Sequence, residues 1–138
     1  MTLEELARTL PNGFHDAEFR TVLLDYGRRR VLIDVSVWIG DMDAKFAPRE
    51  GYRDGELVID GLHFVVIEPP DPRYPFAENT SLCVAGCSPP SKSDFASVSA
   101  LPAGCFASRF FVNEWNSFIH VAARGANLTW KGAAYDRG

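Results

Sequence analysis

Two adjacent residues near the N-terminus, His15 and Asp16, carry side chains that could bind a ligand or move a proton. They lie just after Gly13 and just before a strand-like run that begins at Ala17. Neighbouring side chains on a strand point to opposite faces, whereas on a turn they can converge on one ligand. One hypothesis is therefore a small enzyme or small-ligand binder with a pocket near His15 and Asp16. The alternative is that these side chains bind the backbone of the preceding turn.

A second candidate site comprises Glu114, Trp115 and Asn116, which occupy a predicted turn between two strands. Tryptophan is enriched among the residues that anchor protein interfaces, and the two polar neighbours could add hydrogen bonds. We predict that these three residues bind a protein partner. The alternative is that Trp115 folds back and covers one end of the core.

The cysteines and histidines match no metal-binding or catalytic motif. Cys83 and Cys87 are separated by three residues, a wider spacing than in a zinc knuckle, and Cys105 stands apart from them. We expect free thiols, with no metal and no cofactor. A phosphate-binding loop and a Gly-x-Ser-x-Gly motif are both absent from the sequence. This favours a non-enzymatic role and no catalytic residues, although carboxylates could serve as acids or bases.

Length and composition predict one folded domain over residues 1–138. The chain is 46% hydrophobic and contains 10 Phe, 4 Tyr and 3 Trp, enough to form a large core. Its net charge of −4 argues against binding to nucleic acid or to anionic membranes. The odd number of cysteines and the lack of an apolar N-terminal run predict a cytoplasmic protein.

The elements that must position these residues are mostly strands. Thr2 and Glu5 have the spacing of a capping box, and an apolar stripe from Leu3 to Leu10 predicts a short N-terminal helix. Residues 17–26 and 31–39 predict a β-hairpin whose turn contains Arg28, Arg29 and Arg30. Residues 40–54 are expected to form a loop. Residues 57–59 and 62–67 predict one long strand with a bulge at Gly61, which we prefer because a glycine within a strand often marks a bulge, or else two strands with a tight turn.

The second half of the chain begins with a proline-rich stretch. Seven of the 9 prolines lie between Pro69 and Pro102, so we predict a long connection over about residues 69–104 with one short strand near residues 82–85. Residues 105–112, 117–123 and 127–130 then predict three more strands. The fold class is mainly β (α+β): an antiparallel curled sheet, a partial barrel or sandwich, with one short N-terminal helix.

Two stretches carry a resemblance. Residues 10–17, Leu-Pro-Asn-Gly-Phe-His-Asp-Ala, resemble the beginning of a β-hairpin in small bacterial β-rich proteins. Residues 115–121, Trp-Asn-Ser-Phe-Ile-His-Val, are also similar to a stretch of those proteins. The resemblance implies no particular activity. In size and acidity the chain also resembles small bacterial immunity proteins, which block a toxin by binding it.

Three functional hypotheses follow from the sequence. The leading one is a non-catalytic binding or protein-interaction module of bacterial immunity or inhibitor type. The second is the small enzyme or ligand binder with a pocket near His15 and Asp16. The third is a homodimeric structural protein whose sheet edges pair.

Overall fold

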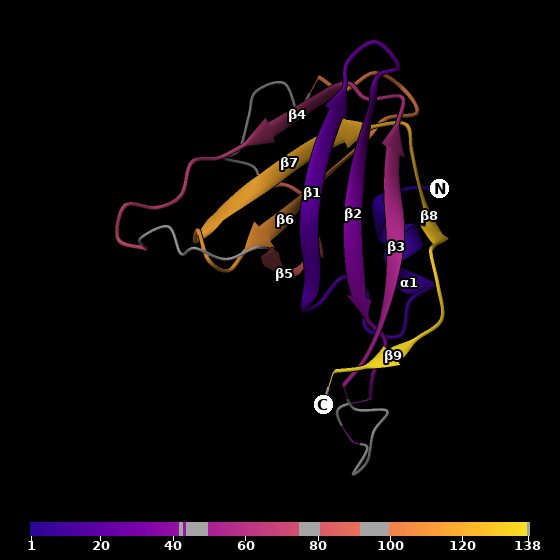
Figure 1. The fold of residues 1–138 in the computed structure, drawn as a ribbon. Coiled ribbons are helices and arrows are strands. Elements are labelled where there is room, and N and C mark those ends of the chain that lie inside the picture. Colours follow the sequence, from indigo (N-terminus) through magenta and orange to yellow (C-terminus); the bar gives the residue numbers. More distant parts are fainter. Residues whose placement is uncertain (42, 44–49, 75–80, 92–99, 138) are drawn as a thin grey trace.

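A computed structural model of the chain describes residues 1–41, 43, 50–74, 81–91 and 100–137 (Figure 1). Within these residues one short helix precedes nine strands, all paired in antiparallel fashion. The elements are α1 (Leu3–Arg8), β1 (Ala17–Asp25), β2 (Arg30–Trp38), β3 (Gly51–Asp60), β4 (Phe64–Ile67), β5 (Leu82–Ser88), β6 (Phe106–Val112), β7 (Ser117–Ala123), β8 (Gly125–Trp130) and β9 (Tyr135–Asp136).

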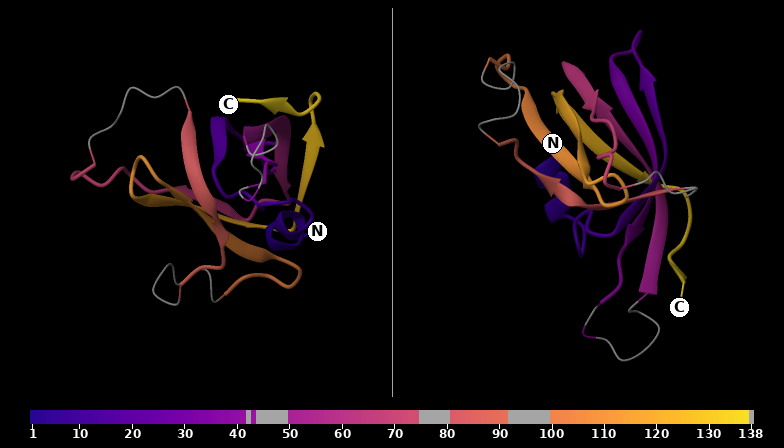
Figure 2. Two further views of the ribbon diagram at one scale, coloured as in Figure 1. Left: turned by 90° about the horizontal axis from the view of Figure 1, so that it is seen from below. Right: turned by 90° about the vertical axis from the view of Figure 1, so that its left-hand side faces the viewer.

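The strands form one curled sheet in the order β4-β7-β6-β5-β1-β2-β3-β8, with β9 paired to β3 (Figure 2). The end strands β4 and β8 do not pair with each other among the described residues, so the sheet is an open, partial barrel. The predicted class, mainly β with a curled antiparallel sheet and one short N-terminal helix, is confirmed.

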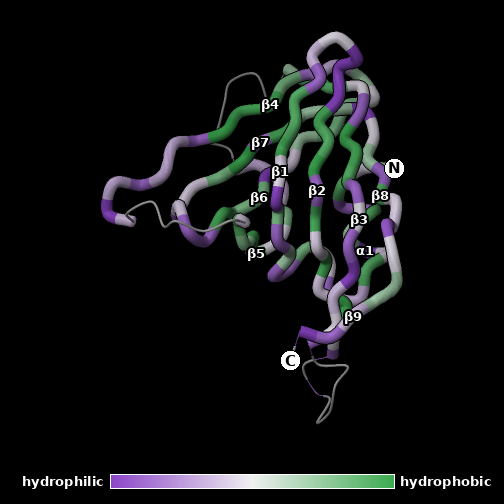
Figure 3. Tube along the Cα trace, viewed as in Figure 1, coloured by the Kyte–Doolittle hydropathy of each residue, from purple (hydrophilic) through white to green (hydrophobic). Residues whose placement is uncertain are grey.

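The core lies on the concave face of the sheet. Alternate residues of β2 are buried there (Val31, Ile33, Val35 and Val37), as the period of two predicts. The two halves of the sheet meet through Phe110 of β6, whose ring packs edge-on against Phe19 of β1 at 4.9 Å and against Phe14 at 5.9 Å. Figure 3 shows that hydrophobic residues are concentrated in the strands, with hydrophilic residues at the hairpin tip and in the loops.

Helix α1 covers part of the core and contacts β8, β5 and β6. Its predicted capping box is present: the Thr2 hydroxyl accepts from the Glu5 N–H, and the Glu5 carboxylate accepts from the Thr2 N–H. Leu3 and Leu6 provide its buried face. No helix among the described residues is long and apolar enough to cross a membrane.

Two predictions about the middle of the chain are wrong. Residues 57–67 do not form one bulged strand, because β3 pairs with β2 and β8 whereas β4 pairs with β7 at the far end of the sheet. Gly61 adopts a φ of 59° between these two strands, where the chain leaves one part of the sheet for the other. The expected loop over residues 40–54 is shorter than predicted, since β3 begins at Gly51.

The proline-rich connection contributes more to the sheet than its sequence suggests. The strand predicted near residues 82–85 runs from Leu82 to Ser88 and lies between β6 and β1 near the centre of the sheet. A glycine with a φ of 119°, Gly86, accompanies a shift of register against β6. Residues 75–80 and 92–99 of the connection lie outside the described part of the chain.

The C-terminal segment crosses the convex face of β1, β2 and β3. Its Arg137 guanidinium lies 3.9 Å from the centre of the Tyr52 ring and pairs with Glu18. The Tyr135 hydroxyl donates to Asp54 over 2.7 Å and lies 2.8 Å from the hydroxyl of Ser36, a fully buried side chain. These contacts connect the end of the chain to three strands at once.

Candidate functional site

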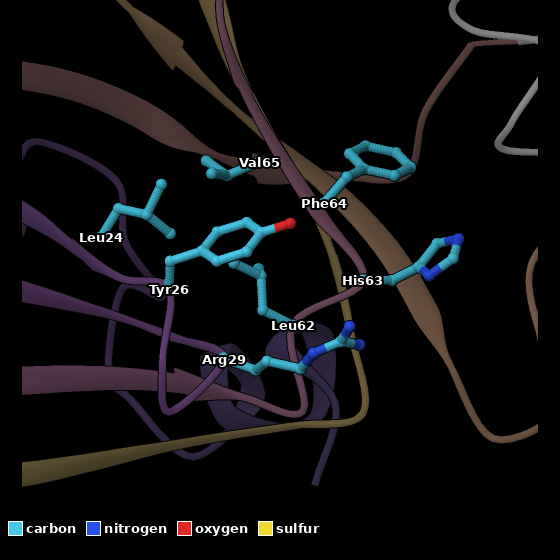
Figure 4. A pocket seen from close by; sticks show the side chains of 7 residues that line it. All are labelled: Leu24, Tyr26, Arg29, Leu62, His63, Phe64 and Val65. Atoms are coloured by element: carbon cyan, nitrogen blue, oxygen red, sulfur yellow. The ribbon is translucent and has the colours of Figure 1, made fainter.

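A pocket of about 270 Å³ lies between the β1–β2 hairpin and strand β4 (Figure 4). We call it the hairpin pocket, and its lining residues are Leu24, Tyr26, Arg29, Leu62, His63, Phe64 and Val65. Most of this lining is apolar, yet Tyr26 is 78% exposed and Leu24 is 46% exposed. Large apolar side chains that stay this exposed beside a concavity are typical of a binding surface.

The pocket lies where β1 and β4 each have a neighbouring strand on one side only, among the described residues. Strand β1 pairs with β5 only from Ala17 to Phe19, and an irregularity in its register against β2 follows between Phe19 and Thr21. From Thr21 to Asp25, β1 therefore has β2 on one side and no strand on the other among the described residues. Strand β4 likewise pairs with β7 alone. Both strands contribute to the pocket wall.

The concave orientation of Leu24 follows from its register. It pairs with Val31, a core residue, and cross-strand partners lie on the same face of a sheet. Val65 lies opposite Val121, another core residue. The hairpin pocket is thus an extension of the core interior, open where the described strands do not close the sheet.

Arg29 is the charged residue of the pocket, and its backbone is unusual. Its φ is 50°, a left-handed conformation that glycine adopts more easily than any residue with a Cβ. The side chains of Arg28 and Arg30 both approach Asp25, at 4.0 and 3.8 Å. Among the described residues the guanidinium of Arg29 has no ion-pair partner, and Figure 4 shows it extending toward His63. The turn therefore presents one cationic group to the pocket.

The residues singled out in the sequence lie elsewhere. Asp16 and Glu114 both contact Cys83, and His15 is next to Asp16. We call His15, Asp16, Cys83, Asn113 and Glu114 the rim cluster. Asp16 Oδ1 lies 3.9 Å from Cys83 Sγ, and Asn113 Nδ2 lies 3.4 Å from the same sulfur. The Cys83 N–H lies 3.0 Å from each carboxylate oxygen of Glu114.

His15 and Asp16 are also close to each other. His15 Nε2 lies 3.6 Å from Asp16 Oδ2, and His15 Nδ1 lies 3.2 Å from the carbonyl oxygen of Ala85. Asp16 has a φ of 57°, which Asp tolerates better than most residues. The backbone turn places both side chains on the surface, and neither lines the hairpin pocket.

The electrostatics of the rim cluster do not activate the thiol. Burial raises the pKa of Cys83, the Asn113 hydrogen bond lowers it, and the negative charges of Asp16 and Glu114 raise it further. The net pKa is above that of an ordinary cysteine, so little thiolate is present at neutral pH. In the part of the chain that the structure describes, no three His, Cys, Asp or Glu residues are arranged so that they could hold a metal ion.

Trp115 and Asn116 occupy the turn between β6 and β7. Trp115 is half-buried and packs against the core, while its carbonyl accepts from the Asp71 N–H at 2.8 Å. Asn116 adopts a φ of 47° and donates to Asp71 Oδ2 at 3.2 Å. Both residues thereby connect the turn to the segment after β4.

A second pocket, of about 330 Å³, lies beside α1 and β8 at the other end of the sheet. Its cationic residue is already engaged: Arg53 lies 4.7 Å from the centre of the Trp130 ring, and its Nε donates to the Gly132 carbonyl over 2.7 Å. Arg29 in the hairpin pocket has no such contact among the described residues, so the hairpin pocket is the stronger candidate site.

Sequence reasoning missed the hairpin pocket. Its signal was present in Leu23, Leu24 and Tyr26, three large apolar residues in the last part of a strand that leads into a charged turn. That signal could not identify the opposite wall of the pocket, since Leu62 to Val65 approach the hairpin only in the folded chain. No protein-family model, curated protein or solved structure matches this chain.

Proposed function

We propose that this protein is a non-catalytic binding module that holds a partner protein at the hairpin pocket. The observation that carries the proposal is the pocket itself: an apolar concavity, continuous with the core, whose wall includes the exposed side chains of Leu24 and Tyr26 and the cation of Arg29. Exposed aromatic and arginine side chains beside a pocket are the residues that most often dominate binding energy.

The size of the pocket favours a side chain of a protein over a whole small molecule. Sites for small ligands usually enclose 300–1,000 Å³ and bury most of the ligand. The hairpin pocket has about 270 Å³, and its lining residues Tyr26 and Leu24 remain largely open to solvent. One or two side chains of a partner would fill it, and the surrounding surface would contact the rest of that partner.

The acidic balance of the chain bears on the type of partner. A net charge of −4 speeds the encounter with a basic protein and slows the encounter with an acidic one. An inhibitor of bacterial immunity type, which blocks a toxin by covering it, is therefore the biological role that we propose. The raised pKa of the Cys83 thiol supports a role that does not depend on this group as a nucleophile.

The test uses a photo-crosslinking amino acid, benzoylphenylalanine, in place of Tyr26 in the full chain, illuminated in lysate of the native host. Tyr74, which is also exposed but does not line the hairpin pocket, is the control position. We expect one defined protein to be crosslinked from position 26 and not from position 74, and mass spectrometry would identify it.

A matched pair of variants connects the crosslink to the pocket. Leu23 and Leu24 are adjacent and both exposed, but Leu24 faces the pocket whereas Leu23 pairs with Leu32 on the other face of the sheet. Leu24→Asp should abolish the crosslink, and Leu23→Asp should leave it. A crosslink between two copies of this chain would instead support the homodimer, and the absence of any product specific to position 26 would overturn the proposal.

A further inference from the structure

We infer that the partner contributes an extended segment that adds as a strand to the free edge of β4, with an apolar side chain in the hairpin pocket and a carboxylate on Arg29. This inference rests on the proposed function and specifies what the pocket recognises. Three independent features support it: strand edges that no described residue pairs with, the alternation of side chains along a strand, and the charge of the pocket.

The first feature is the pair of free edges. An edge strand exposes N–H and C=O groups that an added strand can bind, and such addition is a common way to recognise peptides. Here β4 is bonded to β7 on one side only, and β1 has no neighbour beyond Phe19 on the side away from β2, both within the described residues. Leu24, Phe64 and Val65 from these two strands line one pocket, so an added strand would bind beside an apolar surface.

The second feature fixes which backbone groups are available. The N–H of Glu68 donates to the carbonyl of Phe118 on β7. In an antiparallel ladder the bonded residues alternate, so the N–H and C=O groups of Val65 and Ile67 point away from β7. The side chains of these two residues lie on the concave face, opposite Val121 and Ile119. A partner strand that uses these groups would therefore direct every second side chain toward the pocket.

The third feature is the charge. Arg29 offers a guanidinium that the described residues do not neutralise, and it lies on the side of the pocket where β4 begins. A carboxylate can accept two parallel hydrogen bonds from a guanidinium, which makes this pairing stronger than one between neutral groups. Since the apolar and acidic side chains must both face the pocket, they should be two residues apart in the partner.

A selection experiment tests this chemistry without knowledge of the partner. A phage library of random nine-residue peptides is selected on the full-length protein, on Arg29→Glu and on Leu24→Asp. With the unaltered protein we expect enrichment of peptides that contain a large apolar residue two positions from Asp or Glu. Arg29→Glu should weaken binding of those peptides at least about tenfold and should instead enrich Lys or Arg at the acidic position.

Synthetic copies of one enriched peptide then test the strand geometry. Methylation of a backbone nitrogen removes a hydrogen-bond donor, so methylation at alternate positions should abolish binding and methylation at the intervening positions should leave it. Loss at every position, or at none, would overturn the addition of a strand. Binding that is indifferent to Arg29→Glu would overturn the pairing with a carboxylate.

The outcomes separate this inference from the proposed function. A crosslink from position 26 that depends on Leu24, together with no enriched peptide, would retain the protein-binding role and overturn recognition of an extended segment. Peptides that bind Leu24→Asp as well as they bind the unaltered protein would contradict both, because the pocket would then play no part. Circular dichroism and the urea midpoint of each variant establish that it is folded.

Discussion

The thiol sulfur of Cys83 lies 3.9 Å from Oδ1 of Asp16, although 67 positions separate the two residues in the chain. The proximity of a cysteine, an aspartate and, one residue earlier, a histidine would suggest a nucleophilic site if only the residue types were considered. The charges act in the opposite sense, because an anion beside a thiol disfavours the thiolate. The rim cluster is therefore expected to be chemically inert, and this can be measured.

Alkylation of Cys83 by iodoacetamide should be slower than alkylation of a free cysteine, since burial and nearby anions raise the pKa of its thiol. The measurement uses a chain in which Cys87 and Cys105 are replaced by serine. Asp16→Asn, which keeps a residue tolerated at positive φ, should lower the pKa of Cys83 and speed alkylation several-fold near neutral pH. An alkylation rate equal to that of the unaltered chain would show that Asp16 does not influence the thiol.

Arg29→Gly should stabilise the protein while impairing binding. A left-handed residue with a Cβ costs roughly 1–2 kcal/mol, and glycine removes this strain but loses roughly 0.5–1 kcal/mol of chain entropy on folding. We expect a net gain of up to about 1.5 kcal/mol in the free energy of unfolding by urea. Arg28→Gly is the control, since Arg28 has no positive φ, and it should be neutral or destabilising. Destabilisation by Arg29→Gly would show that Arg29 is a structural residue.

The carboxylate of Glu68 should contribute to stability through two contacts with β7. One oxygen accepts from the Phe118 N–H at 2.8 Å, and the other lies 2.8 Å from Nε2 of His120. His120 is buried, with 3% of its surface exposed. Glu68→Ala removes the carboxylate from both and should lower the free energy of unfolding by about 2 kcal/mol. Glu68→Gln keeps an acceptor and should cost less. Equal stability of the three proteins in urea would contradict this role.

The C-terminal segment should make stability depend on acidity. Burial disfavours the charge of Asp54, but hydrogen bonds from Tyr135, Arg20 and Ser36 outweigh burial and hold its pKa below the ordinary value. A depressed pKa contributes stability that is complete above the unfolded value, about 3.9, and is lost as pH falls through the lower folded value. Tyr135→Phe removes one of these bonds, so its free energy of unfolding should fall less between about pH 6 and about pH 3.

Tyr26→Phe is the control for that measurement, because Tyr26 is highly exposed and is not among the groups that shift the pKa of Asp54. Its dependence on pH should match that of the unaltered chain. An unchanged slope for Tyr135→Phe would mean that the hydroxyl does not influence the titration of Asp54.

Substitutions at Gly61 and Gly104 should distinguish the cost of backbone strain from the cost of a steric clash. Both adopt positive φ, 59° and 83°, but a Cβ on Gly61 would lie 2.7 Å from the Cβ of Arg124, whereas a Cβ on Gly104 would meet no atom within 4 Å. Gly104→Ala should therefore cost only the strain, roughly 1–2 kcal/mol, less the roughly 0.5–1 kcal/mol that alanine saves in chain entropy, and Gly61→Ala should cost more because of the clash. Thermal unfolding of both variants provides the comparison. A smaller cost at Gly61 would show that β3 and β4 can shift to relieve the contact.

The elements that sequence reasoning identified are those whose signals are local. The capping box of Thr2 and Glu5 lies within one helical turn, and the alternation from Val31 to Val37 repeats along one strand, so neither depends on distant residues. Residues 57–67 were harder, because a glycine between two apolar runs is compatible with a bulge or with a change of direction. Only the register of β4 against β7 decides between these possibilities.

The candidate sites show the same division. The sequence singled out His15, Asp16, Glu114, Trp115 and Asn116 as chemically distinctive. It could not show that Asp16 and Glu114 both contact Cys83, or that Trp115 and Asn116 both contact Asp71. Whether these residues bind a partner stays a prediction. The hairpin pocket is formed by two segments about forty residues apart in the chain, and no local sequence pattern indicates that they lie close together in the fold.

The sequence by itself determined that this chain forms strands with one short helix, because side-chain period, capping and turn chemistry act over a few neighbouring residues. It also determined the acidic charge and the supply of core residues. Only the tertiary structure decided the strand order, the central place of β5 and the gap beside β1 and β4. These depend on pairing between distant strands, where the apolar surface buried by the whole sheet selects one arrangement from many that satisfy the same local rules.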